Sequence, residues 1–315
     1  MRRLGLMSEV SQPAPTRCGY VALIGAPNAG KSTLLNRLIG HKLAIVSPKA
    51  QTTRTRLLGI AVEGPAQLVF VDTPGIFAAR RRLDRAMVRA AWSGAEDADE
   101  TVLLVDAERS ASGRGIDRDT RRILDRLAER GRRSVLALNK IDLVRRDALL
   151  GLAATLSKAG RFDPVFMISG LGGDGVEDLK RHLAASLPLS PWLFPEDQLS
   201  DAPERLIAAE ITREQVFLQL HDELPYASTV ETESWQDRHD GSVRIEQVIY
   251  VERPSQRAIV LGEGGQRIKA IGARARAELE QMLARRVHLF LFVKVRQHWG
   301  EDRERFAALG LDYDA

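Results

Sequence analysis

Residues Gly25-Ala26-Pro27-Asn28-Ala29-Gly30-Lys31-Ser32 decide the fold of this chain, because they form a glycine-rich loop between two elements of different type. The apolar run 20–24 before the loop is typical of a buried strand, and leucines recur at helical spacing in residues 33–40 after it. Glycine lets backbone N–H groups close around a polyphosphate. The order strand, loop, helix therefore predicts a phosphate-binding loop.

Two side chains of this loop carry the expected chemistry. Lys31 is expected to reach the β- and γ-phosphates of a nucleotide, and the Ser32 hydroxyl is expected to ligate Mg²⁺. The alternative is a chance match to the pattern GxxxxGK[ST]. The strand before the loop and the helix after it disfavour that alternative.

Length and composition describe an ordinary globular protein of roughly two domains. Of its 315 residues 44% are hydrophobic, and 46 Lys and Arg stand against 42 Asp and Glu, a surplus too small to indicate an anionic partner. The single cysteine, Cys18, excludes an intrachain disulfide and suits a reducing compartment. No apolar stretch approaches the ~18 residues of a transmembrane helix. Residues 1–16 are expected to be a disordered tail, in which Met7 is an alternative start.

The basic stretch 47–56 after the first helix has no apolar periodicity and reads as an exposed loop. An ordinary solvated connector would look the same. In phosphate-loop nucleotidases, however, a threonine in this interval caps the Mg²⁺ and senses the γ-phosphate. Thr53 is the expected residue, and Thr52 is the alternative.

The sequence Asp72-Thr73-Pro74-Gly75 directly follows the apolar strand-like run 68–71 and lies 41 residues after Lys31. An aspartate at the carboxyl end of a buried strand is where a Mg²⁺ shell needs a carboxylate, and the Gly75 N–H can reach the γ-phosphate. Asp72 is therefore expected beside the metal.

A second motif, Asn139-Lys140-Ile141-Asp142, follows the buried strand-like run 134–138 and indicates which base is bound. The Asp142 carboxylate can accept hydrogen bonds from guanine N1–H and its N2 amine, which adenine lacks, and an unpaired buried carboxylate is costly. Asn139 can buttress the loop, and the Lys140 stem can cover the ring. Segment 169–171, after the last predicted strand, can approach the guanine carbonyl through its backbone. Strands alternating with helices predict a doubly wound, mostly parallel sheet with its ligand at the carboxyl ends of the strands.

The second half begins with a proline-rich stretch, 187–203, expected to be a semi-rigid linker. A helix is expected over 204–224, then two strands, the loop Gly262-Glu263-Gly264-Gly265, a helix over 266–283 and a final strand over 287–295. Residues 262–296 contain eight basic and three acidic residues, and such a local surplus of positive charge is typical of a nucleic-acid-binding surface. A GxxG loop beside a basic helix is how KH modules clamp single-stranded RNA.

These motifs in this order resemble the translation-factor-related GTPases, and specifically their Era branch, from about Gly19 to the C-terminus. The resemblance implies a P-loop GTPase domain over 17–186, an α+β type II KH domain over 204–296 and a C-terminal tail over 297–315. It implies Lys31, Thr53 and Gly75 as catalytic residues, and Mg²⁺ ligands in Ser32, Thr53 and Asp72. The implied nucleotide contacts are Gly25, Ala26, Pro27, Asn28, Ala29, Gly30, Lys31, Ser32, Thr33, Asp72, Thr73, Pro74, Gly75, Ile76, Asn139, Lys140, Asp142 and Ser169. The implied RNA contacts are Gly262, Glu263, Gly264, Gly265, Arg267 and Lys269.

Three positions depart from the family pattern, and the role of a fourth, Asn28, is open. Ile76 stands where the best-known small GTPases carry a water-orienting glutamine, although hydrophobic residues are usual there in this family, so slow hydrolysis is expected. Gly170 replaces the usual alanine of the guanine loop. Glu263 stands where a basic residue is common, and its carboxylate should repel phosphates. Asn28 resembles an asparagine that helps to hold K⁺ in related GTPases, and a loop-shaping role is equally open.

The resemblance implies a GTP- and Mg²⁺-dependent, monomeric cytoplasmic GTPase that binds 16S rRNA near its 3′ end and assists maturation of the 30S subunit. Two alternatives remain open. One is a membrane-associated signalling GTPase held peripherally at the inner membrane, since relatives have been linked to that membrane. The other is an RNA-binding protein in which GTP is structural and not hydrolysed.

Overall fold

The computed structural model describes most residues of the chain. The expected disordered tail, except Pro15 and Thr16, lies outside them, as do the alternative start Met7 and the alternative metal ligand Thr52. The described residues are 15–47, 49, 53–54, 57–79, 81–111, 115–131, 133–297, 299–308 and 310–314.

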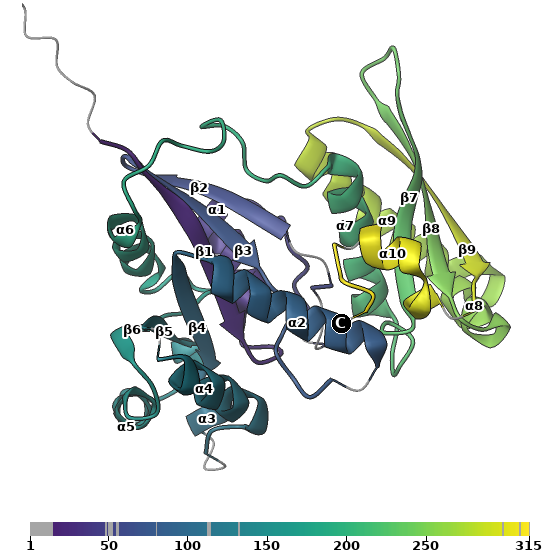
Figure 1. The fold of residues 1–315 in the computed structure, drawn as a ribbon. Coiled ribbons are helices and arrows are strands. Elements are labelled where there is room, and N and C mark those ends of the chain that lie inside the picture. Colours follow the sequence, from purple (N-terminus) through teal and green to yellow (C-terminus); the bar gives the residue numbers. More distant parts are fainter. Residues whose placement is uncertain are drawn as a thin grey trace, which may run out of the picture.

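The first domain is built on a six-stranded sheet of order β2-β3-β1-β4-β5-β6 (Figure 1). Only β2 runs antiparallel, pairing with β3, and all other neighbouring pairs are parallel. The phosphate loop leaves the carboxyl end of a strand inside this sheet, as the sequence predicts. The strands are β1 (Arg17–Gly25), β2 (Leu57–Glu63), β3 (Ala66–Asp72), β4 (Glu100–Asp106), β5 (Ser134–Asn139) and β6 (Phe162–Met167).

Helices cover both faces of this sheet and divide its core in two. One buried cluster contains leucines of α1 and α6, and the other contains apolar side chains of α2, α4 and α5. A sheet covered on both faces needs strands that are apolar throughout, which explains why β3 and β5 are wholly buried. The helices are α1 (Lys31–Ile39), α2 (Arg82–Asp97), α3 (Ala107–Ala111), α4 (Arg118–Arg130), α5 (Arg146–Ser157) and α6 (Val176–Ser186), with the 3₁₀ turn η1 (Ile141–Leu143).

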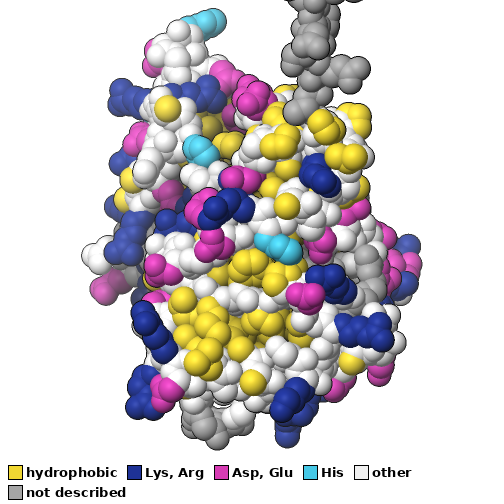
Figure 2. Space-filling model, turned by 90° about the vertical axis from the view of Figure 1, so that its left-hand side faces the viewer, with side chains coloured by type: hydrophobic (Ala, Val, Ile, Leu, Met, Phe, Trp, Pro, Cys, Tyr) yellow, Lys and Arg dark blue, Asp and Glu magenta, His cyan; other side chains and the backbone are white. Residues whose placement is uncertain are grey.

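The side of the first domain that carries α5, α6 and β6 exposes apolar side chains, which gather in the lower half of Figure 2. Strand β6 is an edge of the sheet, and most of its residues are only half-buried. Among the residues described, Leu150 on α5 is 66% exposed. The ring of Phe166 lies 5.5 Å from that of His182, which partly covers the edge strand.

The second domain packs helices on a three-stranded sheet of order β7-β8-β9, in which β8 and β9 are parallel. Its first helix ends at Gln219, five residues earlier than expected, because Leu220 is already extended. The two expected strands, the expected helix after the GxxG loop and the expected final strand are confirmed, whereas the helix over residues 254–261 was not predicted. The elements are α7 (Glu204–Gln219), β7 (Ser228–Asp237), β8 (Val243–Val251), α8 (Pro254–Leu261), the turn η2 (Glu263–Gly265), α9 (Gln266–Leu283) and β9 (Val287–Val295).

The proline-rich segment between the domains is attached to the first sheet, chiefly by the buried side chain of Gln67. Its amide oxygen accepts hydrogen bonds from the N–H groups of Leu193 (2.9 Å) and Phe194 (3.0 Å), and its amide nitrogen donates to the Phe194 carbonyl (2.8 Å). Isolated bridges also join Arg17 to Leu189 and Gly59 to Ser200. Because backbone groups of this segment are satisfied by the first domain, its path over the sheet is defined.

The two domains share buried surface. The apolar cluster that contains α1 and α6 continues into α7, β8 and α9. The last described elements, η3 (Trp299–Glu301) and α10 (Arg303–Ala308), return to the first domain, where Phe306 and Leu311 pack with Ala86 and Met87 of α2. Figure 1 shows α10 between the second domain and the end of α2.

We predict that Gln67→Ala destabilises the protein by about 1–3 kcal/mol, because it leaves the N–H groups of Leu193 and Phe194 without their acceptor. The measurement is thermal unfolding followed by circular dichroism. Gln198→Ala is the matched control, since the Gln198 side chain donates one bond, to the Ser200 carbonyl, in the same segment. Equal unfolding midpoints for the two variants would contradict this role for Gln67.

Candidate functional site

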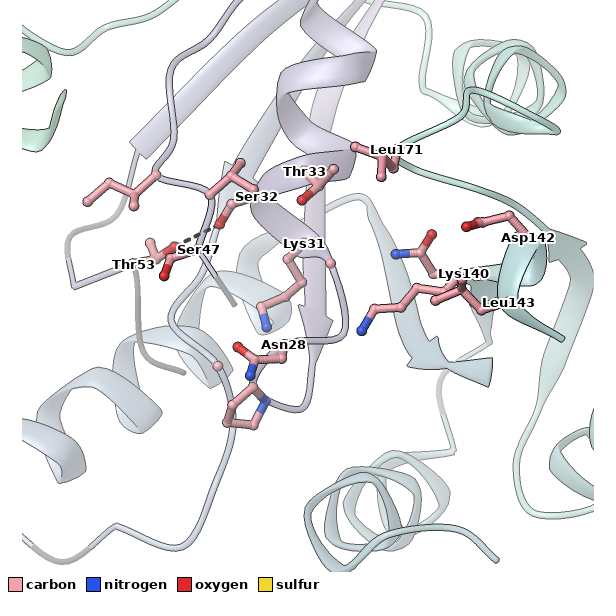
Figure 3. A pocket seen from close by; sticks show the side chains of 16 residues that line it. Asn28, Lys31, Ser32, Thr33, Ser47, Thr53, Lys140, Asp142, Leu143 and Leu171 are labelled. Carbon is pink, nitrogen blue, oxygen red and sulfur yellow. Dashed lines mark hydrogen bonds between the residues drawn. The ribbon is translucent and has the colours of Figure 1, made fainter. Parts of the chain in front are cut away.

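The phosphate loop occupies the connection between β1 and α1, and its backbone is held open by unusual dihedral angles. Asn28 and Gly30 have φ angles of 65° and 97°. A Cβ atom on Gly30 would lie 2.1 Å from Nδ2 of Asn139, so no other residue fits there. The loop thereby places the N-terminus of α1, with its free N–H groups, at the mouth of a pocket (Figure 3).

Lys31 begins α1 and points back into the loop (Figure 3). Its side chain is buried, and Nζ donates to the carbonyls of Gly25 (3.0 Å) and Ala26 (3.1 Å). Burial lowers the pKa of the Lys31 ammonium to about 8, and the nearby Asp72 carboxylate partly offsets this shift. A polyphosphate beside Nζ would favour the charged form further, so the lysine and an anion stabilise each other.

Ser32, Thr53 and Asp72 bring three oxygen atoms together from three segments. Thr53 Oγ1 lies 3.0 Å from Ser32 Oγ and 3.0 Å from Asp72 Oδ2, and Ser32 Oγ lies 3.4 Å from Asp72 Oδ2. Burial raises the pKa of the Asp72 carboxyl to about 6, partly offset by Lys31. The other carboxylate oxygen, Oδ1, is buried and has no hydrogen-bond partner among the described residues. A hard divalent cation would satisfy such an oxygen, so this donor set fits Mg²⁺.

The loop that follows β3 lies against the phosphate loop. Thr73 Oγ1 donates to the Leu23 carbonyl (2.7 Å), and the Ile76 N–H donates to the Gly25 carbonyl (3.1 Å). A Cβ atom on Gly75 would lie 3.2 Å from the backbone of Pro27, which explains the glycine. The side chain of Ile76 packs in the core beneath and does not line the pocket.

Asn139, at the end of β5, joins the phosphate loop to the segment after β6. Its Nδ2 donates to the Ala29 carbonyl (2.8 Å), and its Oδ1 accepts from the Gly170 N–H (2.8 Å). This geometry confirms the expected buttressing role. Ser169 is buried, and its hydroxyl accepts from the Gly172 N–H (2.9 Å), so its side chain shapes the loop from within.

Lys140 and Asp142 form the far wall of the pocket (Figure 3). Lys140 has a φ angle of 66°, and its Nζ lies 2.5 Å from Asp106 Oδ2, which fixes the direction of the stem. Asp142 lies on η1 with an exposed carboxylate. Leu143, which we did not predict, and Leu171, whose segment we expected to approach the base through its backbone, line the same wall and are 57% and 73% exposed. Leu143 directly follows the predicted motif Asn139-Lys140-Ile141-Asp142, and this position was the signal that could have identified it.

The pocket enclosed by these residues has a volume of about 420 Å³, in the range of a small-ligand site. It brings together predicted residues from separate segments of the chain: Pro27, Asn28, Gly30, Lys31, Ser32, Thr33, Thr53, Gly75, Asn139, Lys140 and Asp142. Ile45, Val46 and Ser47 also line it and were not predicted. The other predicted contacts lie behind this lining: Gly25, Ala26, Ala29, Asp72, Thr73, Pro74, Ile76 and Ser169.

The predicted RNA-binding residues form a second, separate feature, at the turn between α8 and α9. Gly262, Gly264 and Gly265 have φ angles of 71°, 55° and 76°, so the turn depends on glycine. No described atom lies within 4 Å of a Cβ built on Gly264 or Gly265, and the turn opens onto the N-terminus of the 18-residue helix α9. Such a turn can receive a phosphate closely.

The side chains around this turn differ in charge. Glu263, Arg267 and Lys269 are charged residues at the surface, and Arg267 Nη1 contacts the Ile259 carbonyl at 3.5 Å. Ile259 on α8 is 49% exposed and was not predicted as part of the surface. The turn thus combines two basic groups with one carboxylate and an apolar side chain.

Two properties of the described residues bear on other site classes. They contain no group of three or more His, Cys, Asp or Glu side chains arranged to hold a metal ion. In the same part of the chain, each helix is too short or too polar to cross a bilayer.

Comparison with known proteins matches both domains. Residues 20–140 fit the family model described as 50S ribosome-binding GTPase, and residues 223–300 fit that of the KH domain. The GTPase Era of Rhizobium meliloti (strain 1021) is 60% identical over 95% of this chain and 94% of its own length. The GTPase Era of Agrobacterium fabrum (strain C58 / ATCC 33970) is 58% identical over 98% of this chain and 99% of its own.

Two solved structures are similar over the whole fold, and each covers 94% of this chain and 99% of its own at 36% identity. One is Era in complex with MgGDPNP and nucleotides 1506–1542 of 16S ribosomal RNA, with a TM-score of 0.87. The other is a single-residue variant of Aquifex aeolicus Era bound to GDP·AlF₄⁻, with a TM-score of 0.86. With near-complete coverage by relatives of 58–60% identity, and with the P-loop GTPase and KH folds both present, this chain belongs to the GTPase Era family.

Proposed function

We propose that this GTPase binds 16S rRNA near its 3′ end through the α8–α9 turn and assists maturation of the 30S subunit under control of its nucleotide. One observation carries the proposal: a protein with the same two-domain fold was solved with MgGDPNP and nucleotides 1506–1542 of that RNA. Its place of action would be the cytoplasm. Flotation with lipid vesicles separates this from the alternative of peripheral attachment to the inner membrane.

In the proposed mechanism GTP lies across the pocket with its phosphates at the N-terminus of α1. Lys31 and the N–H groups of the phosphate loop bind the β- and γ-phosphates, and the Gly75 N–H meets the γ-phosphate. Mg²⁺ held by Ser32, Thr53 and Asp72 would neutralise the charge that develops during phosphoryl transfer. The uncompensated Oδ1 of Asp72 supports this assignment. Asn28 lines the pocket and is our candidate for a potassium contact.

The base would lie between the Lys140 stem and the apolar wall of Leu143 and Leu171, with its edge at Asp142. A carboxylate selects a base that offers two adjacent N–H donors, which is guanine. No glutamine follows Gly75 to orient the attacking water, because Ile76 stands there and is turned into the core. Hydrolysis by the isolated chain would therefore be slow.

Replacing Lys31 with alanine should weaken GTP binding by about 100-fold or more, because it removes the buried ammonium that faces the phosphates. Isothermal calorimetry with GTP and Mg²⁺ gives the affinity. Lys180→Ala is the control, since Lys180 lies on α6 outside the pocket, where its Nζ pairs with Glu63 (3.3 Å). Unchanged affinity in the Lys31 variant would refute the phosphate site.

Asp142→Asn should reduce the preference for GTP over xanthosine triphosphate by at least about 100-fold, because an amide can donate to the xanthine oxygen and no longer accepts both guanine protons. Competition binding against a fluorescent guanine nucleotide measures the preference. The neighbouring exposed carboxylate provides a control, Asp147→Asn. A variant that still rejects xanthosine triphosphate would show that another residue selects the base.

Arg267→Ala and Lys269→Ala should each reduce the salt dependence of RNA binding by roughly 0.7–1 in the slope of log K against log salt, as expected for one lost phosphate contact. Glu263→Gln should increase affinity several-fold at low salt, because it removes a repulsive charge. Filter binding of nucleotides 1506–1542 tests both, with Arg181→Ala in the first domain as the control. If all four variants bound alike, the α8–α9 turn would not be the RNA site.

A further inference from the structure

Segment 42–54, which leads from α1 to Thr53, is attached to the second domain at several described residues. Lys42 pairs with Glu214 of α7 and Glu278 of α9, and the Val46 N–H donates to Glu214 Oε1 (2.8 Å). Lys49 Nζ contacts the carbonyls of Phe217 and Leu220 at the end of α7. These contacts place the proposed γ-phosphate sensor on a segment that also touches the RNA-binding domain.

Arg54 makes the most deeply buried of these attachments, with 4% of the residue exposed. Its Nη1 donates to the Ser228 carbonyl (2.7 Å), and its Nη2 to the carbonyls of Tyr226 (3.1 Å) and Pro225 (3.3 Å). The guanidinium carbon also lies 5.3 Å from the ring centroid of Trp299. All of these partners lie beyond the first domain, at the start of β7 and after β9.

The preceding residue, Thr53, makes its contacts within the first domain. Thr53 Oγ1 contacts Ser32 and Asp72 of the proposed metal site, both at 3.0 Å. Consecutive Cα atoms are ~3.8 Å apart, so Thr53 cannot move by an ångström or two without displacing Arg54. Hydrogen bonds weaken steeply with angle, so such a displacement would disturb the fork of contacts to 225–228.

Arg54 is also costly to move. Its charge is compensated chiefly by carbonyl dipoles and two aromatic rings, Trp299 and Phe217, together with the more distant carboxylates of Glu210 and Asp84. Burial and, next, the positive charge of Arg213 lower the pKa of this guanidinium, as expected for a desolvated cation beside a like charge. A buried charge that leaves its partners loses several kcal/mol of compensation. The Arg54 contact therefore has a small number of favourable positions.

Trp299 links the residues that Arg54 contacts to the C-terminal segment that packs on α2. Its indole N–H donates to the Ala227 carbonyl (3.0 Å), beside the carbonyls that Arg54 contacts. The same C-terminal segment continues to Phe306 and Leu311, which pack on α2, the helix that follows Gly75. Both loops that approach the γ-phosphate position thus lead to the surroundings of Trp299.

We propose that Arg54 is a positioning residue that couples Thr53 to the RNA-binding domain, so that GTP and RNA change each other's affinity through this side chain. The inference rests on the proposed function and names the residue through which the bound nucleotide would control RNA affinity. Coupling between two ligands is reciprocal and typically amounts to 5–150-fold. The Arg54 side chain, which directly follows Thr53 in the chain and is bound to the carbonyls of residues 225, 226 and 228, provides the physical link that such coupling requires.

The test measures binding of nucleotides 1506–1542 of 16S rRNA to the full chain loaded with GDPNP or with GDP, each with Mg²⁺, at one salt concentration. The wild type should show an affinity ratio of about 5–150 between the two states. Arg54→Ala should bring this ratio to within about twofold of one, while GDP affinity changes little. Arg54→Lys keeps the charge without the fork and should lower the ratio as well.

Arg205→Ala is the matched control. Arg205 lines the same cavity as Arg54 and also donates to carbonyls of β7, those of Thr232 (3.2 Å) and Glu233 (3.0 Å), but neither of these hydrogen bonds involves a residue of segment 42–54. It should keep the wild-type ratio, which separates coupling from general loosening of the second domain. If Arg54→Ala fails to fold, the Arg54→Lys ratio decides.

The possible failures are distinguishable. A wild type that binds neither guanine nucleotide nor this RNA overturns the proposed function. A wild type that binds both, with a ratio of one, leaves binding in place and overturns coupling. A wild-type ratio retained in both Arg54 variants overturns the role of Arg54 alone.

Discussion

The side-chain amide of Asn139 is the interaction on which the rest of the site depends. It holds the Ala29 carbonyl with its nitrogen and the Gly170 N–H with its oxygen, so the phosphate loop and the loop after β6 are fixed at one distance. A nucleotide is rigid enough that its base and phosphates must be received together. One buried amide with both ends satisfied provides that spacing without a charge that would compete with the ligand.

Two buried charged side chains of the site, Lys31 and Asp72, are only partly compensated by their surroundings. Burial lowers the pKa of Lys31 and raises that of Asp72, and the mutual attraction of the two groups only partly offsets either shift. Isolated buried charges are unfavourable, and structures retain them where a ligand completes the set. An anion would compensate the charge of Lys31, and a cation would compensate that of Asp72. A polyphosphate with a bound metal ion would supply both.

The two domains are joined more firmly than a proline-rich connection suggests. Gln67 satisfies backbone groups of segment 187–203, a buried apolar cluster runs from α1 into α7, and the C-terminal residues pack on α2. Arg54 adds a polar contact within this interface. The domain that carries the GxxG turn is therefore positioned by segments that also surround the pocket of the first domain, so the pocket and the turn are connected through packed residues.

The sequence by itself determined the doubly wound sheet, the order of the motifs and the GxxG turn, because these depend on periodicity and on local backbone requirements such as the glycines at 30 and 264. It also pointed to Lys31, Asp72 and Asp142, because their motifs follow strands whose carboxyl ends meet at one edge of a parallel sheet, and to Thr53 by its place in the loop between the first helix and Asp72. Only the tertiary structure decided that Leu143 and Leu171 wall the pocket, that Ile76 faces the core and that α7 ends at Gln219. It alone revealed Arg54, because an arginine in a basic loop looks solvated until a distant segment supplies the carbonyls that bury it.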